Sequence, residues 1–424
     1  MRGQTTRILN LMASDTKIYE GVFAINKPTS ISSAQVLRDL QRHFNPSSLF
    51  APWLEHARAK RTQESRFQRQ RRREKGRIQV KLGHGGTLDP LATGVLITGV
   101  GSGTKALSRF LECTKSYEAV VLFGAATDTY DTEGKVVARA PYSHVTREAV
   151  EAALQKFRGK GMQRPPVFSA LRVGGKRLYE YAREGGAIPE IKEREVDVLE
   201  LELVEWMEPG THGYKWPERE AEKVEKEAAS KLMNMEEVEG ISLKTPPPDE
   251  QPNTVVSDSP DLKRKREEGS VDETTDDAAK KLKSDTDTNT ERTSTAPQPQ
   301  LADSIPYQLP ELASVSTPAP QPQIQPQPPA ARLRMTVTSG FYVRSLCHDL
   351  GPAVKSLGIM AALVRTRQGD FELRKNVLEY DDLAKGEEVW GEKVKGMLEE
   401  WDEKENGGDR RSRSRSRERE ADIE

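Results

Sequence analysis

Short apolar runs and one amphipathic run predict the first folded elements. Residues 21–25 read Gly-Val-Phe-Ala-Ile, and residues 117–123 read Tyr-Glu-Ala-Val-Val-Leu-Phe. Both runs are short and rich in β-branched and aromatic residues, which favours buried strands. Residues 33–43 place their apolar side chains on one face of a helix, and Thr146 is typical of the N-cap of a second helix. The pattern predicts strands and helices without a strict βαβ repeat.

Two further runs alternate apolar and polar residues, as half-buried strands do. They cover residues 196–203, with one slip of the alternation at Leu199, and residues 333–338. The segment between them is polar, and the entropy of closing a loop grows only slowly with its length. We therefore expect adjacent strands with an expanded connection. The predicted fold class is α+β, one discontinuous domain with a mixed, largely antiparallel central sheet, interrupted by a long disordered insertion.

Composition supports this division of the chain. Only 35% of the 424 residues are hydrophobic and 31% are charged, and 15 of the 26 prolines fall within residues 241–330. Such a segment buries too little apolar surface to offset the entropy of ordering. The predicted organisation is a leader (1–20), a first folded part (21–208) with a basic insertion (48–81), a disordered insertion (209–330), a second folded part (331–400) and an Arg/Ser-rich tail (401–424).

Residue counts exclude several classes of protein. Two cysteines cannot form a disulfide framework, and together with six scattered histidines they argue against a zinc cluster. No apolar run approaches the ~20 residues of a membrane-spanning helix, so we expect no membrane association.

The densest candidate for chemistry lies at residues 83–96, Gly-His-Gly-Gly-Thr-Leu-Asp-Pro-Leu-Ala-Thr-Gly-Val-Leu. Glycines on both sides of Asp89 indicate a tight loop, and Pro90 restricts Asp89 to an extended backbone. Such a loop would present one carboxylate from a rigid frame, although a turn that merely connects two elements explains the spacing equally well. A phosphate-binding loop is excluded because no Gly-Lys-Ser/Thr follows.

This segment resembles the central motif of the TruB family of pseudouridine synthases. The resemblance continues along the folded parts and is closest to the eukaryotic, fungal-type members of that family. The other matching segments are Ile25–Pro28 with Ser30, Lys115–Tyr117, Gly124–Gly134, Pro165–Leu171 with Gly175–Arg183, Ser339–Leu346 and Leu363–Arg367. The resemblance implies the pseudouridine synthase catalytic fold.

It also implies roles for individual residues. Asp89 matches the nucleophile that isomerises uridine to pseudouridine, by attack on ribose or base or by stabilising charge on the sugar. Tyr117 matches the tyrosine that stacks on the uracil, and Arg344 the arginine that pairs with the aspartate. Taken without the resemblance, Tyr117 is an ordinary core tyrosine and Arg344 a surface charge.

The remaining matches line the expected pocket. Tyr342 and Leu363 correspond to residues that wall the uracil, and His84 to a histidine associated with flipping the nucleotide out of its stack. Lys27 matches a lysine near the site, to which we assign no chemical step. The resemblance implies neither a metal nor an organic cofactor.

Three functions are compatible with these residues. The first is isomerisation of uridine 55 in the T loop of tRNA by a protein that acts alone, as a monomer, with other RNAs such as mRNA as further substrates. The second is a guide-RNA-dependent synthase that acts on ribosomal RNA, and the third is a non-catalytic tRNA-binding chaperone. The tail by itself would also suit an Arg/Ser splicing-type adaptor, which the folded parts do not support.

Sequence signals outside the folded parts bear on location and on RNA binding. Basic clusters at 263–266 and 280–283 resemble nuclear import signals, and residues 1–14 resemble a weak mitochondrial presequence. Residues 58–77 hold ten basic and two acidic residues, so we expect them to follow tRNA phosphates. The predicted location is the nucleus, with the mitochondrion as a second site.

Overall fold

A computed structural model describes residues 17–63, 78–184, 189–226 and 327–421, with side chains omitted for 182–184 and 406–421. These residues belong to one compact unit, formed by residues 1–246 and 325–424, and the second unit, 247–324, lies outside the described residues. The predicted leader up to residue 16, both nuclear import signals, residues 64–77 and the side chains of the Arg/Ser repeat also lie outside them.

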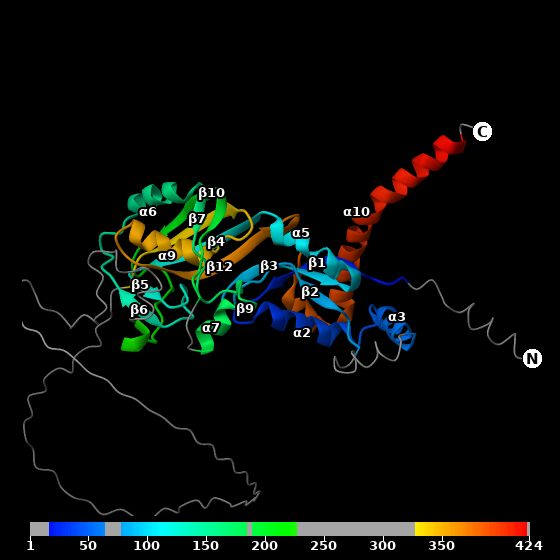
Figure 1. Cartoon of the computed structure of the whole chain (residues 1–424), viewed down its shortest axis with the longest axis horizontal. Helices are drawn as coiled ribbons and strands as arrows, with labels where there is room; N and C mark the ends of the chain where they lie inside the picture. Colours follow the sequence, from blue (N-terminus) through cyan, green and yellow to red (C-terminus); the bar gives the residue numbers. More distant parts are fainter. Residues whose placement is uncertain (1–16, 64–77, 185–188, 227–326, 422–424) are drawn as a thin grey trace, which may run out of the picture. The chain divides into compact units, whose positions relative to one another are not determined.

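A mixed ten-stranded sheet organises the unit, in the order β14-β1-β3-β12-β4-β11-β10-β7, with β2 beside β3 and β13 beside β12 (Figure 1). Most pairs are antiparallel, and β1–β14 and β3–β12 are parallel. This arrangement confirms the predicted fold class. The main-sheet strands are β1 (Gly21–Lys27), β2 (Leu82–His84), β3 (Thr93–Val100), β4 (Lys115–Phe123), β7 (Gly159–Gln163), β10 (Arg194–Met207), β11 (Ala330–Val337), β12 (Gly358–Gln368), β13 (Phe371–Glu372) and β14 (Leu378–Glu379).

Two small hairpins and seven α-helices complete the described fold. The hairpins are β5 (Ala125–Thr127) with β6 (Val136–Arg139), and β8 (Arg172–Val173) with β9 (Lys176–Arg177). The helices are α2 (Ser33–Phe44), α3 (Ala51–Thr62), α5 (Leu107–Glu112), α6 (Arg147–Leu154), α7 (Leu178–Glu184), α9 (Val343–Ala353) and α10 (Glu387–Ala421). No described helix has the length and apolar character needed to cross a membrane.

The alternation of side chains along the strands buries both faces of the sheet. In β1, Phe23 and Ile25 join the main core with the apolar face of α2, while Val22 and Ala24 pack in a second cluster beside Leu107 of α5. Strand β4 behaves alike, since its odd-numbered residues from 117 to 123 face the main core and its even-numbered apolar residues face another cluster. The strands therefore read as nearly continuous apolar runs.

Strands β10 and β11 pair antiparallel, as their alternation predicted. The slip at Leu199 is a β-bulge between Val198 and Glu200, and the Leu199 side chain is exposed. The long connection thus leaves and rejoins the sheet at neighbouring strands.

Ordered structure extends into the polar segments beyond the folded parts that composition predicts. Residues 209–226, predicted as part of the disordered insertion, pack against the folded part. Tyr214 and Trp216 cover a sheet face, and the Trp216 indole donates to the carbonyl of Phe123 at 2.9 Å. Within the basic insertion, residues 51–62 form α3, whose Leu54 is buried in the main core. Helix α10 also continues past residue 400. In residues 209–226 and 51–62, a few aromatic or aliphatic residues supply enough burial to order a polar stretch.

Gly94 permits the parallel contact between β3 and β12. Its φ is +103°, and it pairs with Arg365. A Cβ at this position would overlap the carbonyl oxygen of Arg365 and lie 2.8 Å from its nitrogen. Since backbone atoms cannot move aside cheaply, only glycine fits where the two strands meet.

We predict that Gly94→Ala lowers the free energy of unfolding by about 3 kcal/mol or more, because it combines overpacking with an unfavourable φ. Gly161→Ala in edge strand β7 is the control, because a Cβ there meets nothing within 4 Å; its effect should stay below about 1 kcal/mol. Urea unfolding of both variants checks this, and equal effects would contradict the account.

Candidate active site

The Asp89 loop, residues 85–92, connects β2 to β3 and is fastened to the start of α2. The Ser33 hydroxyl donates to the carbonyl of Leu88 at 3.0 Å and accepts from the Leu88 N–H at 2.9 Å. The backbone N–H of Ser30 donates to the carbonyl of Pro90, also at 2.9 Å. These bonds fix the backbone on both sides of Asp89.

Lys27 lies beneath the same loop, fully buried at the end of β1. Its ammonium donates to three carbonyls, those of Pro28 at 2.7 Å, Pro90 at 3.0 Å and Ala92 at 2.6 Å. Burial lowers the pKa of Lys27 to about 8, and the charge of Asp89 partly opposes that shift. All three N–H donors are used, so Lys27 shapes the loop and has no proton-bearing position left for substrate.

The Asp89 carboxylate lies against the guanidinium of Arg344 in the first turn of α9. Nη2 of Arg344 donates to Oδ1 of Asp89 at 3.1 Å, and Nε lies 2.9 Å from Oδ2. The Arg344 side chain is 6% exposed, whereas that of Asp89 is 34% exposed. A two-point contact with a planar guanidinium orients a carboxylate. The geometry therefore holds one carboxylate in a fixed direction with part of its surface open.

Arg344 is itself held by the chain around it. Nη1 donates to the carbonyl of Thr129 at 2.8 Å, and Nη2 also donates to the carbonyl of Phe168 at 2.9 Å. A second carboxylate, that of Asp131, lies 3.7 Å from Nη1. Burial raises the pKa of Asp131, and Arg344 opposes that shift. The guanidinium of Arg344 is thus held in place by contacts other than the one with Asp89.

Strand β12 supports the other end of the Asp89 loop. The buried guanidinium of Arg365 donates through Nε to the carbonyl of Val95 at 2.7 Å. The amide of Gln368, also buried, donates to the carbonyl of Gly85 at 2.6 Å. The loop is consequently held at both ends.

Tyr117 and Leu363 lie in the same core cluster as Leu88, the residue before Asp89. Both are nearly buried, at 7% and 6% exposure, on the neighbouring strands β4 and β12. The structure thus brings these two predicted residues to the sheet face that the Asp89 loop covers.

His84 lies five residues before Asp89, and Tyr342 lies two residues before Arg344. Among the described residues, no hydrogen bond or ion pair joins either of them to the Asp89 carboxylate. His84 ends β2, its Nδ1 is buried without a hydrogen-bond partner in the described part of the chain, and burial lowers its pKa. Tyr342 is fixed through its backbone, which exchanges two hydrogen bonds with the Gln163 side chain, and the guanidinium of Arg194 lies 5.9 Å from its ring centre.

Sequence reasoning missed the supporting residues. Arg365 and Asp131 lie within matched segments whose motifs give them no role, and the motifs give Lys27 no chemical step. The signal for Lys27 was available, because a lysine that ends an apolar strand must find buried acceptors. The carbonyls of Thr129 and Phe168 had no signal, since any residue type supplies a carbonyl.

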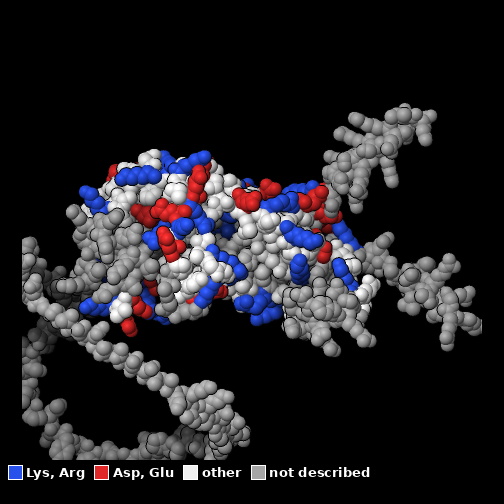
Figure 2. Space-filling view, viewed as in Figure 1, with Lys and Arg blue, Asp and Glu red and all other residues white. Residues whose placement is uncertain are grey.

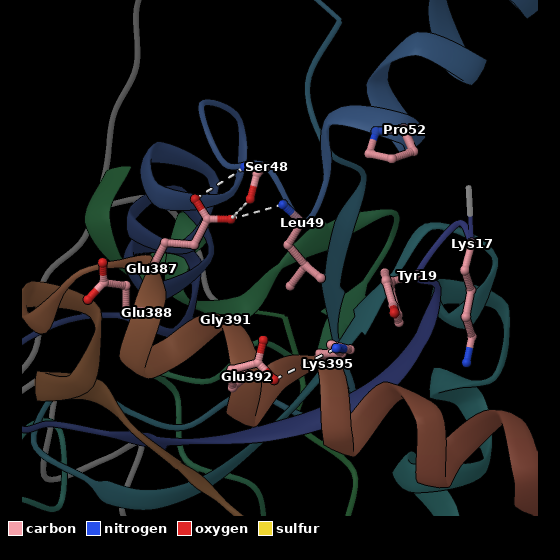
Figure 3. A pocket seen from close by; sticks show the side chains of 10 residues that line it. All are labelled: Lys17, Tyr19, Ser48, Leu49, Pro52, Glu387, Glu388, Gly391, Glu392 and Lys395. Atoms are coloured by element: carbon pink, nitrogen blue, oxygen red, sulfur yellow. Dashed lines mark hydrogen bonds and ion pairs between the residues drawn. The ribbon is translucent and has the colours of Figure 1, made fainter. Parts of the chain in front are cut away.

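A cavity of about 580 Å³ lies elsewhere, between residues 17–19, residues 48–52 and the first turns of α10 (Figure 3). The Glu387 carboxylate accepts from the N–H groups of Ser48 and Leu49 and from the Ser48 hydroxyl, so it ties residues 48–49 to the first turn of α10. None of the predicted site residues lines this cavity. Within the described ranges no group of three or more His, Cys, Asp or Glu is placed to hold a metal ion.

Comparison with known proteins agrees with the motifs. Residues 72–216 match the model of the TruB family pseudouridylate synthase N-terminal domain. The chain is 38% identical to "tRNA pseudouridine synthase 4" of Schizosaccharomyces pombe, over 86% of this chain and 82% of that protein. It is 30% identical to the protein of the same name from Saccharomyces cerevisiae, over 90% and 85%. "tRNA pseudouridine synthase B" of Phocaeicola vulgatus is 47% identical over 31% of this chain and 56% of that protein.

The family match and the two relatives that align over most of their length define the class of protein, a tRNA pseudouridine synthase. The chain belongs to the TruB family of pseudouridylate synthases. The resemblance inferred from its motifs is thereby confirmed.

We predict a pH-dependent contribution from Lys27. Its pKa is about 8 in the native state against 10.5 for an ordinary lysine. Between these values the unfolded chain binds more protons at this site, so native stability rises with pH across that window, by up to about 1.4 kcal/mol per pH unit. The difference in unfolding free energy between wild type and Lys27→Met should therefore be constant from pH 6 to 7 and increase from pH 8 to 10. Urea unfolding at each pH measures it, and a constant difference throughout would contradict the assignment.

Proposed function

We propose that this pseudouridine synthase acts on tRNA, that its target is uridine 55 of the T loop, and that Asp89 is the nucleophile. The observation that carries the proposal is the contact between the partly exposed Asp89 carboxylate and the buried guanidinium of Arg344. The two fungal relatives that match over most of their length are named tRNA pseudouridine synthases, which supports tRNA as the substrate.

The reaction needs a carboxylate that stays ionised and correctly aimed. It breaks the bond between uracil N1 and ribose C1′, turns the uracil and forms a bond from its C5 to C1′. Asp89 can attack the ribose or the base, or stabilise positive charge on the sugar. In each route the fixed position of Asp89 reduces the reorganisation needed during the reaction.

The other residues would bind the flipped nucleotide. Tyr117 would stack on the uracil, while Leu363 and Tyr342 would wall the pocket. A neutral His84, favoured by its lowered pKa, suits a group that enters the RNA loop in place of the extruded base. Arg344 would act through Asp89 as a positioning residue.

Two rival functions make different demands. A guide-RNA-dependent synthase requires other RNA for activity, and a chaperone binds tRNA without changing it. The presence of Asp89, Tyr117 and Arg344 together favours an enzyme over a chaperone. We further propose action as a monomer and other RNAs such as mRNA as additional substrates. On the sequence signals given above, we also propose residence in the nucleus and mitochondrion.

We predict that purified protein incubated with an unmodified tRNA transcript produces one pseudouridine, at position 55, without added RNA or protein. Asp89→Asn, which keeps the shape of the side chain and removes its charge, should reduce the single-turnover rate by at least about 10³-fold while tRNA affinity stays within about threefold. Chemical mapping of pseudouridine and a binding titration provide the measurements.

The other outcomes separate the rivals. Product that forms only after guide RNA is added would support the guided enzyme. Tight tRNA binding by wild type with no product under any condition would support the chaperone.

A further inference from the structure

A polar groove of about 320 Å³ lies at the far end of α2 from the Asp89 loop, between α2, α3 and residues 78–79. Its polar lining consists of Gln41, Arg42, Asn45, Arg58 and Gln79. Among the described residues that line it, the two arginines are the formal charges and no carboxylate is present. The groove is therefore locally positive, although the protein as a whole has a net charge of -1. On the face seen in Figure 2, basic and acidic side chains are interspersed, so local clusters of this kind decide where an anion binds.

The two guanidinium groups are available for an external partner. Arg58 on α3 is exposed and has no ion pair or hydrogen bond within the described residues. Arg42 pairs with Asp39 at 2.7 Å, but its side chain is 72% exposed, so this pair is weak and easily exchanged. Asp39 keeps other donors if Arg42 leaves, namely the Gln35 amide at 2.8 Å and the Tyr380 hydroxyl at 2.9 Å.

The walls of the groove are rigid and lead directly to the Asp89 loop. The side chain of Gln41 donates to the carbonyl of Val80, and that of Asn45 accepts from its N–H, so α2 holds the segment that enters β2. Strand β2 then ends at His84, and α2 begins at Ser33, which binds the Asp89 loop. Arg42 lies nine residues after Ser33, about 14 Å along the helix axis. About four stacked nucleotides at roughly 3.4 Å each cover that distance.

We propose that this groove binds phosphates of the substrate RNA backbone, at a second contact site outside the pocket for the target uridine. The inference rests on the proposed function for the identity of the RNA. Arginine side chains with adjacent neutral amides suit phosphodiester oxygens, which accept hydrogen bonds and carry charge. The site thus contributes affinity and orientation and leaves the choice of base to the residues around Asp89.

The test is the affinity of the full-length protein for an unmodified tRNA transcript, measured by fluorescence anisotropy over a series of salt concentrations. Arg42→Glu/Arg58→Glu should weaken binding about tenfold or more at 0.1 M salt and lower the slope of log affinity against log salt by about 2, since each phosphate contact contributes about 0.9. Arg42→Ala/Arg58→Ala should show the same change of slope with a smaller loss of affinity.

The matched control is Arg147→Glu/Lys156→Glu, which makes an equal change of net charge. These exposed residues lie in and just after α6, which packs on β10, four strands from β3 and its partner β2. Control affinity should stay within twofold of wild type. Single-turnover isomerisation by Arg42→Glu/Arg58→Glu at saturating tRNA should also remain within threefold, because neither residue contacts the Asp89 loop.

Each other outcome overturns the inference. Binding by the groove variants that matches the control means that RNA does not occupy the groove. Binding that becomes tighter means that an acidic segment of the protein occupies it instead. The proposed function is tested separately, by whether the wild-type protein forms pseudouridine at position 55. If it does not, the salt dependence of tRNA binding can still show whether the groove binds RNA.

Discussion

The buried guanidinium of Arg344 is the group around which the site is built. Removing an arginine from water is costly unless it is paired and hydrogen-bonded, and here the carbonyls of Thr129 and Phe168 and the Asp89 carboxylate accept from its two Nη atoms. These partners come from three separate segments of the chain. The position of Asp89 therefore depends on the assembly of the whole sheet, including the part that follows the long insertion.

The remaining contacts make the Asp89 loop stiff. Lys27, Ser33 and Gln368 each bond to its backbone, from β1, α2 and β12 respectively. A loop backbone held in this way fixes where its carboxylate begins, so on the proposed function the RNA would bring the uridine to it. On the proposed function, RNA contacts remote from Asp89 would hold the RNA while the nucleotide is extruded.

The fold could be predicted from the sequence where the signal is local. The apolar runs at 21–25 and 117–123 and the helix from Ser33 follow from periodicity, and even the bulge at Leu199 is visible as a break in alternation. The position of β12 between β3 and β4 could not be predicted, because parallel pairing of distant strands leaves no local pattern. Likewise the tryptophan and tyrosine that order residues 209–226 are too few to stand out against a polar background.

The site divides in the same way. Asp89 and Arg344 were found through motifs, and the structure places them in contact although 255 residues separate them. The contacts that hold Arg344 are mostly to backbone carbonyls, which no residue type marks. The role of Lys27 follows only from the three carbonyls that its buried ammonium reaches. Sequence thus identifies the proposed nucleophile, whereas its positioning depends on backbone geometry.

The most direct test is a structure of the protein bound to a T-arm RNA with 5-fluorouridine at position 55. Completion of the reaction requires loss of a proton from C5, and fluorine cannot leave as a proton, so the complex should stop before product. The account predicts nucleotide 55 flipped out of the RNA, with an Asp89 carboxylate oxygen bonded to, or within about 3.5 Å of, ribose C1′ or a carbon of the uracil ring, and with Arg344 still against Asp89. A nucleotide 55 that stays stacked in its loop, or an Asp89 turned away from it, would contradict the account.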